Sequence, residues 1–175
     1  MVPIGERRWE NDAEHSWSIA LLACSLAPRI DASLDVGKIC QFAVVHDLVE
    51  VYAGDTSTFA SKSEHASKPQ REAKALKTIS KEFAAFPWII QTIEAYEHKD
   101  TNEALFLYAV DKYITILYDY IDEAQLFRER KITLAAYNKS LEDHRKKVQV
   151  HPEIAKYYDE VRALLDARPE YFHQK

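Results

Sequence analysis

Glycine is scarce in this chain, with three residues in 175. Tight hairpin turns between strands rely on glycine where the backbone needs a positive φ, so the scarcity of glycine argues against a sheet with many hairpins. Strong helix formers such as Ala, Leu, Glu and Lys are abundant instead. The alternation of apolar and polar residues that marks half-buried strands is missing. A chain of this length can bury one sizeable core, so we predict an all-α, single-domain helical bundle over residues 1–175.

Capping residues, prolines and apolar positions spaced three or four apart mark the expected helices. Asn11 or Asp12 caps the first helix, which Pro28 closes. Residues 56–69, rich in Ser, Thr, Lys and Glu without periodicity, predict a surface loop. We expect helices over residues 13–27, from Asp35 to Gly54, and over residues 70–85, 87–98, 102–128, 132–148 and 152–167.

Charge and apolar patterning exclude several classes of protein. The net charge is -5 and the 23 basic residues are scattered, so we expect no nucleic-acid polymer as a partner. No apolar run of about 18 residues occurs, which predicts no membrane span, and the charged N-terminus does not resemble a signal peptide. Cys24 and Cys40 lie in apolar helical patterns and are expected to be buried free thiols. We therefore expect a cytoplasmic protein.

The segment FAVVHDLVEVYAGDT contains the most informative polar residues. It places His46, Asp47 and Glu50 in an otherwise apolar helix that we expect to be centrally buried. Burying an ionised carboxylate costs on the order of several kcal/mol unless it is paired, hydrogen-bonded or bound to a metal. His46 and Glu50 are four residues apart and would share a helical face, with Asp47 beside them. A divalent cation would satisfy this group.

Two further residues interrupt apolar helices and qualify as ligands. His15 precedes the apolar run from Ile19 to Leu26, and Asp111 lies in ALFLYAVDKYITILY. Two imidazoles and two carboxylates suit a borderline or hard divalent ion, and leave room for water and a phosphate oxygen. We predict one divalent ion, with Mn, Co, Fe, Ni, Zn and Mg as candidates. An open site of this kind is typical of catalysis.

Simpler interpretations exist for each residue taken alone. His15 could be an ordinary partly exposed helix-start residue. Asp111 could pair with the lysine that follows it, and Asp47 could cap a neighbouring helix. Asp55, after a glycine, could serve a turn or an N-cap. Glu50 has fewer alternatives because apolar residues surround it.

Three segments together resemble the HD superfamily: NDAEHSWSIALLA around His15, VVHDLVEVYAGDT around His46 and EALFLYAVDKYITILYDY around Asp111. They are similar to the branch that contains bacterial 5'-deoxynucleotidases and the human-type HD-domain-containing phosphohydrolases. The resemblance extends from about Arg8 to Asp122. Residues after Ala124 match no motif, so the expected C-terminal helices, over about residues 131–168, lie outside it.

The resemblance implies a role for each matching residue. It makes His15, His46, Asp47 and Asp111 the metal ligands. It makes Glu50 the acid that orients or deprotonates the attacking water. Asp55 resembles the residue that helps to hold this water, protonates the leaving oxygen or contacts the sugar.

Arg8 and Trp9 are the candidate substrate-binding residues. Arg8 resembles a phosphate or substrate contact, for which its guanidinium fork is suited. Trp9 either stacks on a base or packs against the fold. The Arg8-Trp9 pair lies closer to His15 than the comparable pair of the family, and only seven residues precede Arg8 where family members usually have a further helix.

The activity implied is that of a 5'-deoxynucleotidase, which cleaves a deoxynucleoside 5'-monophosphate into nucleoside and phosphate. One alternative keeps the site but hydrolyses nucleoside triphosphates or another pyrophosphate-containing nucleotide, with Lys62, Lys68 and Arg71 as binding residues. A second alternative is a regulatory domain that binds metal and nucleotide without turnover. The resemblance and the tyrosine-rich last third of the chain also suggest a homodimer.

Overall fold

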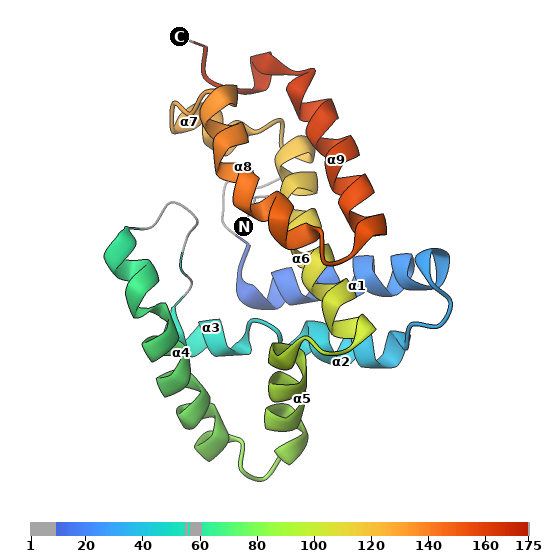
Figure 1. The fold of residues 1–175 in the computed structure, drawn as a ribbon. Helices are drawn as coiled ribbons and strands as arrows, with labels where there is room; N and C mark the ends of the chain where they lie inside the picture. The colour runs from blue at the N-terminus through green and yellow to red at the C-terminus, as the bar shows by residue number, and fades with distance from the viewer. Residues whose placement is uncertain (1–9, 55, 57–60, 175) are drawn as a thin grey trace.

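The computed structural model describes residues 10–54, 56 and 61–174. Every regular element within these ranges is helical, which confirms the predicted all-α fold (Figure 1). The elements are α1 (Asp12–Ile30), α2 (Val36–Val45), α3 (Leu48–Ala53), α4 (Lys62–Glu82), α5 (Pro87–His98), α6 (Asn102–Ile121), α7 (Gln125–Glu129), α8 (Leu134–Val148), α9 (Pro152–Asp166) and the short 3₁₀ helix η1 (Pro169–Tyr171).

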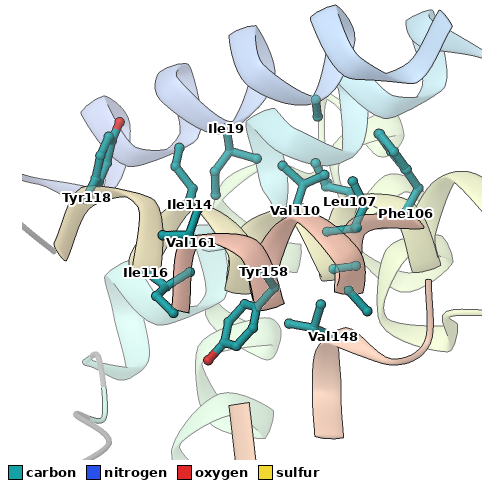
Figure 2. Packing of buried hydrophobic residues seen from close by; sticks show 14 of the residues in the cluster. Ile19, Phe106, Leu107, Val110, Ile114, Ile116, Tyr118, Val148, Tyr158 and Val161 are labelled. Carbon is teal, nitrogen blue, oxygen red and sulfur yellow. The ribbon is translucent and has the colours of Figure 1, made fainter. Parts of the chain in front are cut away.

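Helix α6 is the centre of the bundle. It packs against α1 and α2 on one side and against α8 and α9 on the other. Figure 2 shows Val110 and Ile114 of α6 near Ile19 of α1, while Tyr158 and Val161 extend from α9 into the same core. All five side chains are buried. Because α1, α2, α5, α8 and α9 all pack against it, α6 fixes the position of any polar residue that its buried face carries.

A smaller apolar cluster supports α3 and α4. Val45 at the end of α2, Ile79 of α4, and Ile89 and Ile93 of α5 form this cluster. Helix α4 packs along α3, and α5 packs on α2 (Figure 1). The cluster therefore holds the α2–α3 junction, where the His-Asp pair lies, against two further helices.

Local capping fixes the start of α1. The Asn11 side chain accepts hydrogen bonds from the backbone N–H groups of Ala13 and Glu14, and the Glu14 side chain accepts one from the Asn11 backbone N–H. This capping box satisfies N–H groups that the first turn leaves free. The predicted stop at Pro28 is wrong, because α1 continues to Ile30 with Pro28 inside it. Pro28 lies in the last turn of α1, and the helix ends two residues later.

The helix predicted from Asp35 to Gly54 is two helices. It breaks at His46 and Asp47, and Asp47 adopts φ -100° and ψ 2°. Helix α2 buries four apolar side chains, but α3 buries none, and Val51 is 55% exposed. The expectation of one centrally buried helix is therefore wrong for its second half. Apolar composition alone does not report such a break.

Two other boundaries also differ from the prediction. The expected loop over residues 56–69 is wrong from Lys62 onward, because Ser61 and Glu64 form a capping box that starts α4 there. The helix predicted over residues 102–128 ends at Ile121, and α7 follows after Glu123 and Ala124 adopt positive φ angles. No residue that favours positive φ marks this point in the sequence.

Two expectations about the environment of the chain can be compared with the described residues. None of the helices within them is long and apolar enough to cross a membrane. Both cysteines are free, but the expectation that both are buried is wrong, since Cys40 is exposed and Cys24 is only half-buried. Cys40 lies on the solvent side of α2.

Candidate metal centre

His15 lies in the first turn of α1, where the capping box holds the backbone, and its side chain is buried. Its Nδ1 atom lies 3.3 Å from Glu10 Oε2, and its Nε2 atom lies 3.3 Å from Asp111 Oδ1. A carboxylate on Nδ1 fixes the orientation of the ring and directs Nε2 toward the interior. His15 is therefore not the exposed helix-start residue of the simpler interpretation.

His46 lies at the C-cap of α2 and is also buried. Its Nδ1 atom lies 2.9 Å from the carbonyl oxygen of Ala43. A carbonyl can only accept, so Nδ1 carries a hydrogen and donates, and Nε2 is the atom that can offer a lone pair to a metal ion. This Nε2 atom is buried and makes no hydrogen bond. The ring edge packs against Tyr96, with ring centroids 6.2 Å apart.

Asp111 lies on the buried face of α6. Its Oδ1 atom faces His15, while its Oδ2 atom accepts a 2.6 Å hydrogen bond from Lys112 Nζ. The structure therefore contains the Asp111–Lys112 salt bridge of the simpler interpretation, and Oδ1 of the same carboxylate still faces His15. One side chain serves both contacts.

Asp47 occupies the break between α2 and α3. It is the N-cap of α3 by position, but its side chain makes no capping hydrogen bond. Its Oδ2 atom lies instead 3.2 Å from His46 Nε2 and 3.8 Å from His15 Nε2. The break in the helix therefore turns this carboxylate toward both imidazoles, and its side chain remains 22% exposed.

Together these residues fit a divalent metal ion. Ligand atoms of His15, His46 and Asp111 all lie within 4.8 Å of one another, and Asp47 lies beside them. Both histidines have Nδ1 occupied by an oxygen acceptor and Nε2 facing the shared carboxylates. This arrangement of outer partners is typical of histidines that ligate metals. His46 Nε2 is buried and makes no hydrogen bond, although Asp47 Oδ2 lies 3.2 Å away, and a bound cation would explain this arrangement.

The electrostatics of the cluster reflect its opposite charges. Burial disfavours a charged His15, but its hydrogen bonds to Asp111 and Glu10 outweigh burial and raise its pKa to about 9. Burial also opposes ionisation of Asp111, yet Lys112 and the histidines hold its pKa well below the usual range. Burial raises the pKa of Asp47. A cation would replace the proton on His15.

Glu50 lies one turn after Asp47, on α3. Its Oε1 atom accepts a 2.8 Å hydrogen bond from Lys68 Nζ, and Lys68 also lies 3.5 Å from Glu72. The side chain of Glu50 is 25% exposed, so it is reached by solvent. This ion pair ties α3 to α4.

The turn that follows α3 is fixed by Gly54 and Arg71. Gly54 adopts φ 80° and ψ 131°, a conformation that L-residues with a Cβ rarely adopt. Arg71 donates hydrogen bonds to the carbonyl oxygens of Ala53 and Gly54 and to Thr56 Oγ1. The glycine thus sets the direction of the chain and the guanidinium holds it there.

The structure brings together the four predicted ligands, His15, His46, Asp47 and Asp111. Their role as ligands stays a prediction. Arg8, Trp9 and Asp55 lie outside the described residues, so their predicted roles remain expectations.

Two further residues support the cluster, and sequence reasoning missed one of them. Glu10 orients His15, and Lys112 neutralises one oxygen of Asp111. Glu10 precedes the helix in a charged segment, where nothing in the sequence distinguishes it from other acids. Lys112 was predicted only as an alternative salt-bridge partner of Asp111, and this salt bridge is confirmed.

Comparisons with known proteins agree with this geometry. A family model described as the HD domain matches residues 2–154. Among solved structures, the chain resembles the crystal structure of a predicted metal-dependent phosphohydrolase from Magnetospirillum magnetotacticum MS-1, with 27% sequence identity and a TM-score of 0.73. The alignment covers 96% of this chain and 85% of that one. A search of curated proteins gave no significant match.

Proposed function

Because the chain belongs to the HD domain family, we propose that it is a metal-dependent phosphohydrolase whose ion is held by His15, His46, Asp47 and Asp111. The observation that carries this proposal is the orientation of the two histidines. Each has Nδ1 directed to an oxygen acceptor and Nε2 directed to the cluster, and His46 Nε2 has no hydrogen-bond partner. The solved structure of a predicted metal-dependent phosphohydrolase with a similar fold supports the same activity.

The side chains of the cluster suggest a division of labour. A divalent ion supplies charge neutralisation for a phosphoryl group and makes water a better nucleophile. Glu50 is the residue that takes the proton from the attacking water on its carboxylate. Lys68 donates a hydrogen bond to Glu50 Oε1 and so orients this carboxylate. General-base catalysis of this kind contributes roughly 10²–10⁴-fold to rate.

We propose a nucleotide as the substrate, with a deoxynucleoside 5'-monophosphate as the first candidate. The sequence resemblance around His15, His46 and Asp111 supports this choice. Of the basic residues considered for a triphosphate substrate, Arg71 is engaged with the carbonyl groups of Ala53 and Gly54. Lys68 is paired with Glu50 and Glu72, and the triphosphate alternative stays open for test.

Phosphate release from a panel of nucleotides tests the proposal. The metal-stripped protein is supplied with Mn, Co, Mg or Zn and assayed on deoxy- and ribonucleoside mono- and triphosphates. We expect metal-dependent release from monophosphates, and a loss of at least about 100-fold in kcat for Glu50→Gln. Glu72→Gln is the matched control, because Glu72 also contacts Lys68 but lies on α4. Metal binding without turnover of any nucleotide would support the regulatory-domain alternative instead.

A further inference from the structure

The two cysteines of the chain lie on neighbouring helices. Cys24 is on α1 and Cys40 is on α2, and these helices lie side by side, joined by residues 31–35 (Figure 1). Both are free thiols, of which Cys24 is half-buried and Cys40 is exposed. Neither is a predicted metal ligand, so an inference about this pair does not depend on the proposed function.

Two contacts fix how α1 and α2 are aligned. The ring centroids of His15 and His46 are 5.6 Å apart. The Cys24 Sγ atom donates a weak hydrogen bond to the carbonyl oxygen of Val36, 3.7 Å away. Cys24 lies nine residues after His15 on α1, and Val36 lies ten residues before His46 on α2. The helices are therefore antiparallel, and this alignment places Cys24 beside the first turn of α2.

Cys40 follows Val36 by four residues, so the two residues share one face of α2. In an α-helix the N–H group of residue i+4 donates to the carbonyl oxygen of residue i. The Val36 oxygen that the Cys24 thiol contacts therefore also accepts from the backbone of Cys40, which brings the two cysteines together around one atom. Burial raises the pKa of the Cys24 thiol and the neighbouring Cys40 raises it further, which agrees with this proximity.

Small side chains surround Cys24 on its side of α1. Ala20 precedes it by four residues and Ala27 follows it by three, so both lie next to it on the helix surface. Ala27 is fully buried and Ala20 packs against the core. The distance between two packed helices depends on the side chains at their contact, so alanines allow α2 to approach closely here. A disulfide needs such an approach, since it joins residues whose Cα atoms are usually about 4.4–6.8 Å apart.

We propose that Cys24 and Cys40 form a dithiol site that reacts with a small-molecule disulfide and closes into an intramolecular disulfide between α1 and α2. The exposed Cys40 thiolate attacks the oxidant first, which forms a mixed disulfide and releases one thiol. The Cys24 thiol then loses its proton and attacks the Cys40 sulfur, and the second thiol leaves. The two cysteines together lose two electrons and two protons, and one molecule of the oxidant is reduced to two thiols.

Oxidised glutathione, added to the full chain after reduction and removal of the reductant, tests the proposal. We expect both thiols to disappear together and the mass of the chain to fall by that of two hydrogen atoms, without a link to a second chain. Because the sequence holds two cysteines, the thiol count is unambiguous. The control Cys24→Ser should stop at the mixed disulfide of Cys40 with glutathione. In the unchanged protein, a mixed disulfide that persists while Cys24 stays free, or a disulfide between two chains, would overturn the proposal.

Comparison with the unfolded chain shows whether the fold itself positions the pair. The equilibrium constant for disulfide formation is measured in mixtures of reduced and oxidised glutathione, with and without concentrated urea. A disulfide that fits the native structure favours the folded state, so we expect the constant to be roughly 30-fold larger or more in the native chain. A constant that is equal or smaller in the native chain would show that the fold holds the two thiols apart, and would overturn the proposal.

Discussion

His15 and Asp111 are 96 residues apart in the sequence, yet His15 Nε2 lies 3.3 Å from Asp111 Oδ1. Ile19 and Ala23 continue the same face of α1 into the core, where they are fully buried with Val110 of α6. The contact between the histidine and the aspartate is therefore positioned by the packing of α1 on α6. The candidate metal centre is built into the core, unlike a site carried on a loop.

The central position of Asp111 predicts the effect of removing its charge. Asp111→Asn should weaken binding of a divalent ion by more than the roughly 10–100-fold typical of altering an outer partner of a ligand. His98→Gln, an exposed histidine on α5, should leave the affinity unchanged. Calorimetric titration of the metal-stripped variants measures both. Equal affinities of Asp111→Asn and the unchanged protein would show that Asp111 is no ligand.

The raised pKa of His15 predicts how metal binding depends on pH. Its pKa of about 9 means that the metal-free protein holds a proton there at neutral pH, because Asp111 and Glu10 stabilise the charged ring. The ion can bind only after this proton leaves, so the apparent affinity should rise about tenfold per pH unit from pH 7 to pH 9. Calorimetric titrations of the protein with the metal, in buffers of different ionisation enthalpy, measure how many protons are released on binding. An affinity independent of pH over this range would contradict the prediction.

A second buried acid, Asp119, predicts a pH effect on stability. Burial raises its pKa to about 7, although Tyr137 donates a 2.6 Å hydrogen bond to it. The unfolded chain ionises this group near pH 4, so the contribution of Asp119 is most favourable below that pH and is lost as the pH rises to about 7, by up to about 4 kcal/mol. Asp119→Asn removes this contribution.

Urea unfolding of Asp119→Asn and of the unchanged protein, at pH 5 and pH 8, measures the contribution of Asp119 to stability. The difference in free energy of unfolding between Asp119→Asn and the unchanged protein should shift in favour of the variant at pH 8. Taking the difference cancels the titration of other carboxylates. A difference that is the same at both pH values would contradict the assignment.

Gly54 predicts a backbone effect next to the site. An added Cβ would lie 3.6 Å from Arg71, an ordinary contact, so Gly54→Ala is costly only through its φ of 80°. We expect a loss of about 1–2 kcal/mol in stability, which lowers Tm by a few degrees. Gly37→Ala, in the first turn of α2, is the control. An added Cβ there would lie 3.2 Å from Asp35 Oδ1, the end of a side chain that must shift slightly, so we expect a change in stability below about 1 kcal/mol. Equal melting temperatures of Gly54→Ala and the unchanged protein would exclude strain at this turn.

The sequence predicted helices well where periodicity and caps agree. The helix over residues 87–98 is confirmed at both ends, with Pro87 at its first position. The prediction from sequence failed where tertiary contacts determine the backbone conformation. The break at Asp47 turns a carboxylate toward two histidines, and the local sequence offers neither glycine nor proline to mark it.

The candidate site shows the same division. His15, His46, Asp47 and Asp111 could be predicted because each interrupts an apolar pattern. Glu10 and the carbonyl group of Ala43 could not, since an exposed-looking acid and a backbone oxygen carry no sequence signal for the contact they make.

The most direct test of the central claim follows metal content and phosphate release together. A divalent ion is titrated into the metal-stripped protein, and both the bound ion per chain and the rate of phosphate release from a nucleotide monophosphate are measured. We predict that the rate rises in proportion to occupancy and levels off at a single ion per chain. A rate that is unaffected by metal removal, or full occupancy without phosphate release, would contradict the assignment of this His-Asp cluster as the centre of a metal-dependent phosphohydrolase.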